Sequence, residues 1–239
     1  MNRVERAIIM AAGIGKRLQP VTLKKPKPLV RVNGTRMIDT IIKSLHRNQI
    51  YEIHIVVGYL KEQFLTLERE YEGIHLIENP YYDICNNISS LYVARDFIEN
   101  AIIIDGDQII CNDSVLNPCF EKSGYNAVYT EEFTNEWLLT VKDDIVTNCS
   151  RNGGKDGWQL FSISRWTADD GKKLKSHIET EFIEKKNRQI YWDDVALFCY
   201  PKDYTLSIYK MNFGDVIEID NFNELIDYDD SYRIDKIEG

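Results

Sequence analysis

The 239-residue sequence lacks three features that would each indicate a different class of protein. It has no hydrophobic run near the ~20 residues that a membrane-spanning helix needs. It has no excess of basic residues, and its net charge of -9 argues against a nucleic-acid partner or an anionic membrane. Its five cysteines are odd in number and show no paired spacing, which suits reduced thiols in a cytosol. We therefore expect a cytoplasmic protein that neither binds nucleic acid nor inserts into a membrane.

The sequence also lacks the residues of several common binding and catalytic sites. A P-loop would need Ser or Thr after Lys16, where Arg17 stands, and a Rossmann dinucleotide loop would need Gly or Ala in place of Leu18. The four histidines form no ligand pair and no catalytic triad. The apolar run at 7–12 is too short for a signal peptide, so we interpret it as a core strand.

What the first half of the sequence does contain is an alternation of strand and helix signals. Hydrophobic residues make up 44% of the chain, enough to form a core without disulfides or metals. Short apolar runs alternate with segments of helical periodicity, a pattern typical of a mostly parallel sheet covered by helices on both faces. The predicted strands span 7–11, 53–57, 74–77 and 101–104, and the predicted helices span 38–45, 60–71 and 91–97.

The second half is less regular, but it shows no internal repeat and no flexible linker. Its elements are three antiparallel strands at 125–131, 137–141 and 158–164, a turn at 152–157, a polar helix at 167–185 and a late strand at 216–219 that returns to the sheet. We therefore expect a single α/β domain over 1–239, with a Rossmann-like, mostly parallel sheet and a small antiparallel subregion.

A glycine-containing loop follows the first predicted strand directly. Gly13 and Gly15 would let backbone N–H groups approach phosphate oxygens closely, and Arg17 and Lys27 would supply the positive charge that a triphosphate needs. On the two glycines alone, an ordinary strand-to-helix turn with surface cations explains the loop equally well.

The longer pattern of this loop is more specific. Ala11-Ala12-Gly13-x-Gly15-x-Arg17-Leu18-x-Pro20-x-Thr22, followed by Pro26-Lys27-Pro28-Leu29-Val30, resembles the signature of the nucleotidyltransferase superfamily. The resemblance implies the fold of the nucleotide-diphospho-sugar transferases. It implies that Arg17 and Lys27 contact phosphates and neutralise departing pyrophosphate. The triphosphate itself would be held by the small residues of the loop, Ala11, Ala12, Gly13 and Gly15.

Carboxylates follow the strand predicted at 101–104, at the sheet edge where ligands bind in open α/β folds. The segment 105–107 is Asp-Gly-Asp, and such a pair suits Mg²⁺, which takes a few hard oxygens plus substrate phosphates. A turn whose acids cap the next segment is the alternative. Resemblance to the superfamily implies that Asp107 and Asp220 are the magnesium ligands, although Asp220 could instead cap a following helix.

A further set of residues combines aromatic rings with carboxylates. Trp137 after Glu136, the aromatic-acid cluster Tyr191-Trp192-Asp193-Asp194 and Glu218 could together form a box that attracts a quaternary ammonium, at ~0.5–2 kcal/mol per aromatic contact. Composition alone favours the alternative, in which these aromatic side chains belong to the core.

Over nearly its whole length the chain is similar to bacterial CTP:phosphocholine cytidylyltransferases, in segments such as 57–64, 134–137, 191–193 and 218–220. The resemblance implies that a phosphate oxygen of phosphocholine attacks CTP in the presence of Mg²⁺, which gives CDP-choline and pyrophosphate without a catalytic Ser, His or Cys. It places Asn87, Ser89 and Ser90 near the pyrimidine, and Trp137, Tyr191, Asp193 and Glu218 around choline. The nucleotide-binding half would span about 1–110 and the acceptor-binding half about 111–239.

Segment 105–108, Asp194 and the longer turn at 152–157 depart from the pattern of these enzymes. A cytidylyltransferase for 2-aminoethylphosphonate and a sugar-1-phosphate nucleotidyltransferase therefore remain alternatives. A GT-A glycosyltransferase is a third, although it would not need Arg17 or the Pro-Lys-Pro segment 26–28. The non-enzymatic alternative is a nucleotide-binding sensor on the same fold. The sequence does not indicate an oligomeric state.

Overall fold

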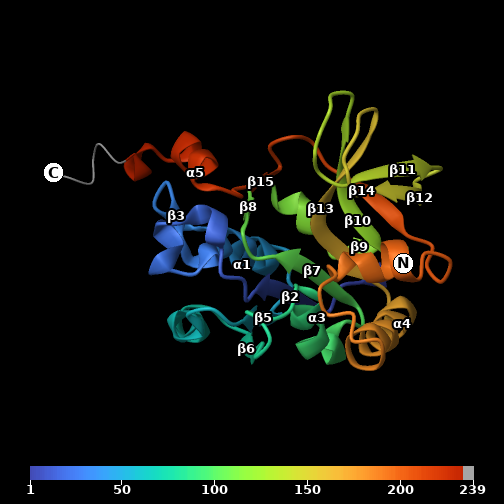
Figure 1. Cartoon of the computed structure of the whole chain (residues 1–239), viewed down its shortest axis with the longest axis horizontal. Coiled ribbons are helices and arrows are strands. Elements are labelled where there is room, and N and C mark those ends of the chain that lie inside the picture. Colours follow the sequence, from blue (N-terminus) through green and yellow to red (C-terminus); the bar gives the residue numbers. More distant parts are fainter. Residues whose placement is uncertain (234–239) are drawn as a thin grey trace.

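The computed structural model describes residues 1–233, which form one mixed sheet with helices on both faces (Figure 1). The sheet has nine strands in the order β10-β14-β12-β11-β13-β7-β2-β5-β6, with a further pairing of β10 and β13. The same sheet contains strands from both halves of the chain. Residues 234–239 of the predicted domain lie outside the described residues.

The first half of the chain supplies the parallel part of the sheet. Its strands are β2 (Arg6–Ala11), β5 (Glu52–Val57), β6 (Ile74–Glu78) and β7 (Ala101–Asp105). β7, β2, β5 and β6 lie side by side and parallel, in agreement with the four strands predicted from apolar runs. Buried parallel strands need apolar residues on both faces, and for this reason they are recognisable in the sequence.

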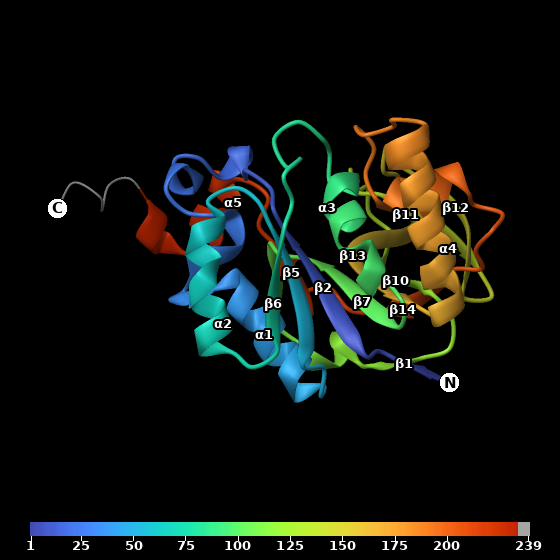
Figure 2. The same cartoon turned by 90° about the horizontal axis from the view of Figure 1, so that it is seen from below.

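Helices cover both faces of this parallel part (Figure 2). α1 (Met37–Arg47) and α2 (Leu67–Glu70) lie on one face, and α3 (Ile88–Val93) and α4 (Ala168–Glu179) lie on the other. The segment predicted as one helix at 60–71 is mostly a 3-10 helix, Lys61–Thr66, which leads into the short α2. Phe64 and Leu67 are both fully buried, and their spacing of three residues matches the 3-10 repeat.

The second half of the chain supplies the antiparallel part, which continues the sheet beyond β7. Its strands are β10 (Gly124–Thr130), β11 (Leu138–Lys142), β12 (Ile145–Ser150), β13 (Gly157–Trp166) and β14 (Ser207–Lys210). The long β13 pairs with β7 and so joins the two parts. The three predicted strands are confirmed, whereas β12 and β14 were not predicted.

The late strand is where the sequence-based prediction of the fold is wrong. β15 (Val216–Glu218) does not return to the large sheet; it pairs antiparallel with β8 (Gln108–Ile110) in a separate two-stranded ribbon. α5 (Phe222–Tyr228) follows it. Two other ribbons pair β1 (Asn2–Arg3) with β9 (Cys119–Phe120) and β3 (Arg31–Val32) with β4 (Thr35–Arg36).

Short 3-10 and π-helical turns complete the chain. The 3-10 turns are Lys16–Leu18, Val21–Leu23, Lys27–Leu29, Arg95–Phe97, Asp113–Leu116 and Asp230–Tyr232, and the π-helical turns are Thr180–Glu184 and Val195–Cys199. The first π-helical turn extends α4 and accounts for the long polar helix predicted at 167–185.

The core of the described residues has two apolar layers, one on each face of the sheet, and a third cluster in which Leu18 and Val30 pack with Ile219 and Leu225. α1 buries Ile38, Ile41 and Leu45 on the layer that contains Ile9 and Ile53. The opposite layer joins inward residues of β2, β5 and β7 to α3 and α4, namely Ile8, Val56, Ile103, Leu91, Leu174 and Ile178. Among the described residues, no helix is both long enough and apolar enough to cross a membrane.

Candidate functional site

The site forms at the carboxyl ends of β2 and β7, the predicted sheet edge. Gly106 follows β7, and its N–H donates to the carbonyl of Met10 at 2.9 Å. A Cβ on Gly106 would lie 3.0 Å from that carbonyl and 3.2 Å from the side chains of Ala11 and Pro28. This close approach favours glycine, and it holds Asp107 against the loop that follows β2.

Two glycines determine the shape of the loop after β2 and the access to its backbone. Gly15 has a φ of 66°, in the left-handed region that favours glycine, and its carbonyl accepts a 2.8 Å hydrogen bond from the Thr22 hydroxyl. No atom lies within 4 Å of the position that a Cβ on Gly13 would occupy. The backbone around Gly13 is therefore open to a ligand that approaches the loop.

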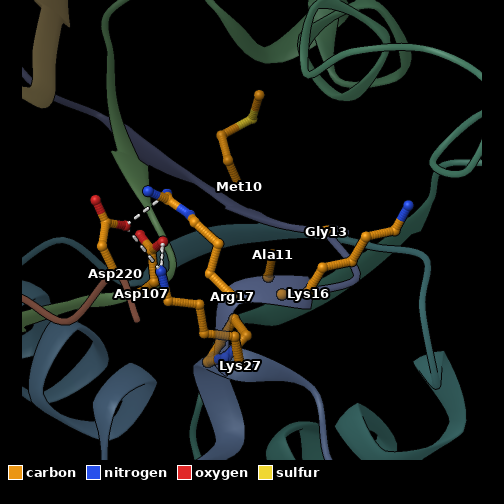
Figure 3. Close-up of a pocket in the computed structure, with 10 residues that line it drawn as sticks. Met10, Ala11, Gly13, Lys16, Arg17, Lys27, Asp107 and Asp220 are labelled. Atoms are coloured by element: carbon orange, nitrogen blue, oxygen red, sulfur yellow. Dashed lines mark hydrogen bonds and ion pairs between the residues drawn. The ribbon is translucent and has the colours of Figure 1, made fainter. Parts of the chain in front are cut away.

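The two predicted catalytic cations contact the two predicted metal carboxylates (Figure 3). Lys27 Nζ lies 2.6 Å from Asp107 Oδ2 and 3.2 Å from Asp220 Oδ1. An Arg17 guanidinium nitrogen lies 3.0 Å from the same oxygen of Asp220. Burial of the Lys27 ammonium opposes its charge, but contacts with Asp107 and then Asp220 outweigh burial and raise the Lys27 pKa. Lys27 is therefore a buried, charged group within the site.

The pair Asp107 and Asp220 fits a small divalent cation that is completed by substrate phosphates. The two carboxylates converge on one ammonium, so the structure shows that a single cation can contact both. Within residues 1–233 no cluster of three or more possible metal-ligating side chains occurs, so a cage made only of protein ligands is not available there. The alternative role of Asp220 as a helix cap is wrong, because Asn221 caps α5 by accepting from the N–H groups of Asn223 and Glu224.

The β8–β15 ribbon brings the two carboxylates together from distant parts of the sequence. Gln108 pairs with Glu218 in register, so Asp107 directly precedes one strand and Asp220 closely follows the other. The Gln108 amide donates to Glu218 Oε1 at 2.7 Å. Burial, and then the charge of Asp107, raise the Glu218 pKa to about 8.

Two adjoining pockets meet at these carboxylates. The first, which we call the glycine-loop pocket, is lined by Met10, Ala11, Gly13, Gly15, Lys16, Arg17, Lys27, Pro28, Asp107 and Asp220. The second, which we call the carboxylate pocket, is lined by Arg17, Asn87, Asp105, Asp107, Glu136, Trp137, Leu160, Ser162, Tyr191, Asp193, Glu218 and Asp220. Arg17, Asp107 and Asp220 line both pockets. A ligand in either pocket would therefore contact the same three charged groups.

The carboxylate pocket contains every residue predicted to surround an acceptor. The rings of Trp137 and Tyr191 meet edge to face, with 5.7 Å between their centroids. Asp193 is 6% exposed, and burial raises its pKa to about 8. Its Oδ1 is buried without a hydrogen-bond partner among the described residues. The pocket thus offers aromatic surface together with a carboxylate oxygen that could accept a hydrogen bond from a cationic ligand.

The structure does not bring every predicted residue to a pocket. Ser89 and Ser90 are buried, and both hydroxyls accept hydrogen bonds of 3.0 Å from the Asn79 amide. Ala12 is buried and lines neither pocket, whereas Asn87 lines the carboxylate pocket. The roles of these residues toward a nucleotide stay predictions.

Other residues join the site besides the predicted ligands. Asp105, Glu136 and Ser162 line the carboxylate pocket, and burial and then the nearby Asp107 raise the Asp105 pKa. Asp105 belongs to the Asp-Gly-Asp pair and Glu136 adjoins Trp137, whereas no motif of the sequence indicates Ser162. Lys16 lines the glycine-loop pocket but extends away from Asp220, whereas Arg17 extends toward it (Figure 3). The carboxylate pocket also draws Arg17, Asn87 and Asp107 from the first 110 residues, so it is not confined to the half predicted for the acceptor.

Comparisons with known proteins agree with this geometry. The model of the nucleotidyl transferase family matches residues 6–123. The chain is 36% identical over 228 residues to the 2-aminoethylphosphonate cytidylyltransferase of Lancefieldella rimae, with 95% of this chain and 92% of the relative covered. It is 34% identical over 233 residues to the choline-phosphate cytidylyltransferase of Streptococcus pneumoniae, with 98% and 94% covered.

A solved structure is similar over almost the whole chain. The CTP:phosphocholine cytidylyltransferase from Streptococcus pneumoniae has 33% sequence identity and a TM-score of 0.88, with 97% of this chain and 100% of that chain covered. The predicted fold class is therefore confirmed.

Proposed function

We propose that this chain, which belongs to the nucleotidyl transferase family, is a cytidylyltransferase. Its acceptor would carry an ammonium group together with a phosphate or a phosphonate. The observation that carries this proposal is the meeting of two pockets of opposite character at Arg17, Asp107 and Asp220. A cationic glycine loop suits the triphosphate of CTP, and a carboxylate-rich pocket with aromatic surface suits an ammonium.

The reaction that fits this arrangement is an in-line transfer. An oxygen of the acceptor phosphate or phosphonate forms a bond to the α-phosphorus of CTP, and the bond between the α-phosphorus and the bridging oxygen of pyrophosphate breaks. The acceptor oxygen is already anionic, so no protein group has to remove a proton. The chain's contribution is to align the two substrates and to stabilise charge on the leaving pyrophosphate.

Lys27 and Arg17 are placed for that electrostatic role. Both line the glycine-loop pocket, and both form ion pairs with Asp220. Burial makes the charge of Lys27 effective, because nearby groups interact more strongly where water is excluded. We propose that both cations exchange a carboxylate oxygen for phosphate oxygens when CTP binds.

Asp107 and Asp220 are the residues that would hold Mg²⁺. A bound magnesium ion would neutralise phosphate charge and fix the orientation of the triphosphate. The carboxylates also keep Lys27 charged, since they raise its pKa.

Phosphocholine is the first acceptor that we propose. A quaternary ammonium cannot donate hydrogen bonds, and it is bound mainly by aromatic faces and nearby negative charge. Trp137 and Tyr191 supply the aromatic surface, and Asp193 and Glu218 supply carboxyl groups in the same pocket. The similarity to two choline-phosphate cytidylyltransferases from bacteria supports this choice.

One observation favours 2-aminoethylphosphonate as a second candidate. Asp193 Oδ1 is buried without a hydrogen-bond partner among the described residues, in a carboxyl group whose pKa burial raises to about 8, and a buried carboxyl oxygen without a hydrogen bond is costly. A primary ammonium has three N–H donors and could satisfy it, whereas a trimethylammonium could not. The similarity to a 2-aminoethylphosphonate cytidylyltransferase points in the same direction.

The test is pyrophosphate release from CTP or UTP with phosphocholine, 2-aminoethylphosphonate or glucose-1-phosphate, with and without Mg²⁺. We expect turnover with CTP and at least one ammonium acceptor, and loss of turnover when the metal is chelated. Turnover with glucose-1-phosphate alone would contradict the proposal. Binding of CTP without turnover of any acceptor would instead indicate a nucleotide sensor.

A further inference from the structure

An arginine outside both pockets contacts the wall of the carboxylate pocket. Arg151 follows β12, and its guanidinium carbon lies 3.8 Å from the ring centroid of Phe198 and 5.7 Å from that of Trp137. Trp137 and Phe198 themselves meet edge to face at 5.5 Å. Arg151 is not among the residues that line the pocket, so its guanidinium packs behind the Trp137 wall.

Arg151 also forms an ion pair with a buried carboxylate next to the pocket. Its Nε donates to Asp194 Oδ1 at 2.9 Å, and a second guanidinium nitrogen donates to the same oxygen. The Asp194 side chain is only 4% exposed, whereas the Arg151 side chain is 47% exposed. A buried carboxylate needs a partner, and among the described residues the only cation paired with Asp194 is Arg151.

Asp194 in turn contacts the segment that carries the other aromatic wall, Tyr191. Its Oδ2 accepts a 2.8 Å hydrogen bond from the backbone N–H of Tyr191. Asp194 therefore fixes the segment that carries both Tyr191 and Asp193, two residues that line the pocket. One guanidinium contacts the Trp137 wall directly and the Tyr191 wall through Asp194.

The loop that carries Arg151 is itself fixed to the loop that carries Trp137. Thr134 and Gly154 exchange backbone hydrogen bonds of 2.8 and 3.0 Å, so the β10–β11 and β12–β13 loops lie side by side (Figure 1). Gly153 has a φ of 66°, and a Cβ there would lie 1.9 Å from the carbonyl oxygen of Thr134. The position of Arg151 relative to Trp137 is thus set by backbone contacts.

We infer that Arg151 and Asp194 are positioning residues that hold the two aromatic walls of the carboxylate pocket for the ammonium end of the acceptor. This inference rests on the proposed function. The pair would act on acceptor binding and not on CTP, because none of its contacts reaches the glycine loop.

The test compares Michaelis constants for the two substrates in three variants. We expect Arg151→Ala to raise KM for the acceptor about tenfold, equivalent to ~1.4 kcal/mol, and to leave KM for CTP within about twofold. Arg151→Lys keeps the charge but loses the planar fork, so its effect should be intermediate. Asp194→Asn keeps an oxygen for the Tyr191 N–H but loses the ion pair, so it should also raise KM for the acceptor selectively.

Arg95→Ala is the matched control. Arg95 stacks on Tyr92 at 4.3 Å and pairs with Glu179 at 2.8 Å, but it lines neither pocket. We expect it to change stability without changing the ratio of the two KM values.

Equal changes of KM for CTP and acceptor in Arg151→Ala and Arg151→Lys would overturn the inference, as would an acceptor-selective effect in Arg95→Ala. If Arg151→Ala does not fold, Arg151→Lys and Asp194→Asn decide the question. A wild-type chain that uses no ammonium acceptor would instead contradict the proposed function itself.

Discussion

The glycine-loop pocket and the carboxylate pocket adjoin each other, but they are built in opposite ways. Most of the glycine-loop pocket comes from one stretch of sequence, residues 10–28, and its protein charges there are positive. The carboxylate pocket is assembled from six separate stretches, at Arg17, Asn87, 105–107, 136–137, 160–162 and 191–193, together with 218–220 from the β8–β15 ribbon. Most of its ionisable side chains are acidic.

This difference separates the chemistry of transfer from the choice of acceptor. The transfer needs a triphosphate held in one orientation, and a short local segment can provide backbone N–H groups and cations at fixed spacing. Recognition of an acceptor needs walls on several sides of a small molecule, which only tertiary structure brings together. Substitutions in the two pockets should therefore affect different kinetic constants.

The largest expected effect is at the border between the pockets. Asp107→Ala should lower kcat by about 10³-fold or more, because it removes a proposed metal ligand and the closest partner of Lys27. The measurement is pyrophosphate release at saturating substrates. Asp113→Ala, which removes only a surface pair with Arg47, is the control. A rate for Asp107→Ala close to that of the control would exclude Asp107 as a metal ligand.

Lys27→Met should lower kcat by ~10²–10³-fold, since it removes a charge that we propose stabilises the leaving group. It should also strengthen binding of Mn²⁺ in the absence of nucleotide, because Asp107 and Asp220 lose the cation that now contacts both. Mn²⁺ binding measured by electron paramagnetic resonance checks this second effect. Lys172→Met, at a surface pair with Glu99, is the control and should leave Mn²⁺ affinity unchanged. Weaker Mn²⁺ binding in Lys27→Met would argue against a metal site at these carboxylates.

A smaller and more selective effect is expected deeper in the carboxylate pocket. Trp137→Ala should raise KM for the ammonium acceptor by about tenfold with little change in KM for CTP, because one aromatic contact is worth ~0.5–2 kcal/mol. Trp158→Ala is the matched control, since Trp158 packs on Tyr129 and does not line the pocket. If the KM values for the acceptor and for CTP rose equally, Trp137 would be a core residue only. The two pockets would then not act separately on the two substrates.

The last expected effect concerns the pH dependence of stability and not a kinetic constant. Burial raises the Asp193 pKa from 3.8 to about 8, so between roughly pH 4 and pH 8 the folded chain keeps a proton that the unfolded chain has released. The free energy of unfolding should therefore fall as pH rises through this window, by at most ~1.4 kcal/mol per pH unit from this group. Asp193→Asn should flatten that slope in urea titrations at pH 5 and pH 8. An unchanged slope would show that Asp193 ionises normally in the folded chain.

The sequence predicted the parallel part of the sheet well because each of its strands is rich in Ile, Leu, Val and Ala, although β5 and β6 each contain one histidine. It did not predict β12 or β14, since β12 has the sequence Ile-Val-Thr-Asn-Cys-Ser and is half exposed, and β14 has only four residues. Neither strand has the periodic burial that identifies a strand by its pattern alone. Their places in the sheet depend on partners far away in the sequence.

The residues of the candidate site show the same contrast between local patterns and long-range contacts. Arg17 and Lys27 could be recognised because they belong to one contiguous motif. The pairing of Gln108 with Glu218 could not, because β8 and β15 are three residues long and Gln108 is a fully buried polar residue. Ser89 and Ser90 were assigned by resemblance alone, and the structure shows that their hydroxyls contact Asn79.

The β8–β15 ribbon also has a consequence for how the protein is made. The loop cations and Asp107 are synthesised in the first half of the chain, but Asp220 is added only after every strand of the large sheet has been translated. Leu18 and Val30 of the loop region pack in one cluster with Ile219 and Leu225, so we expect a nascent chain that lacks this segment to be inactive, with its nucleotide loop incompletely packed. The order of translation would then delay catalysis until β15 has paired with β8.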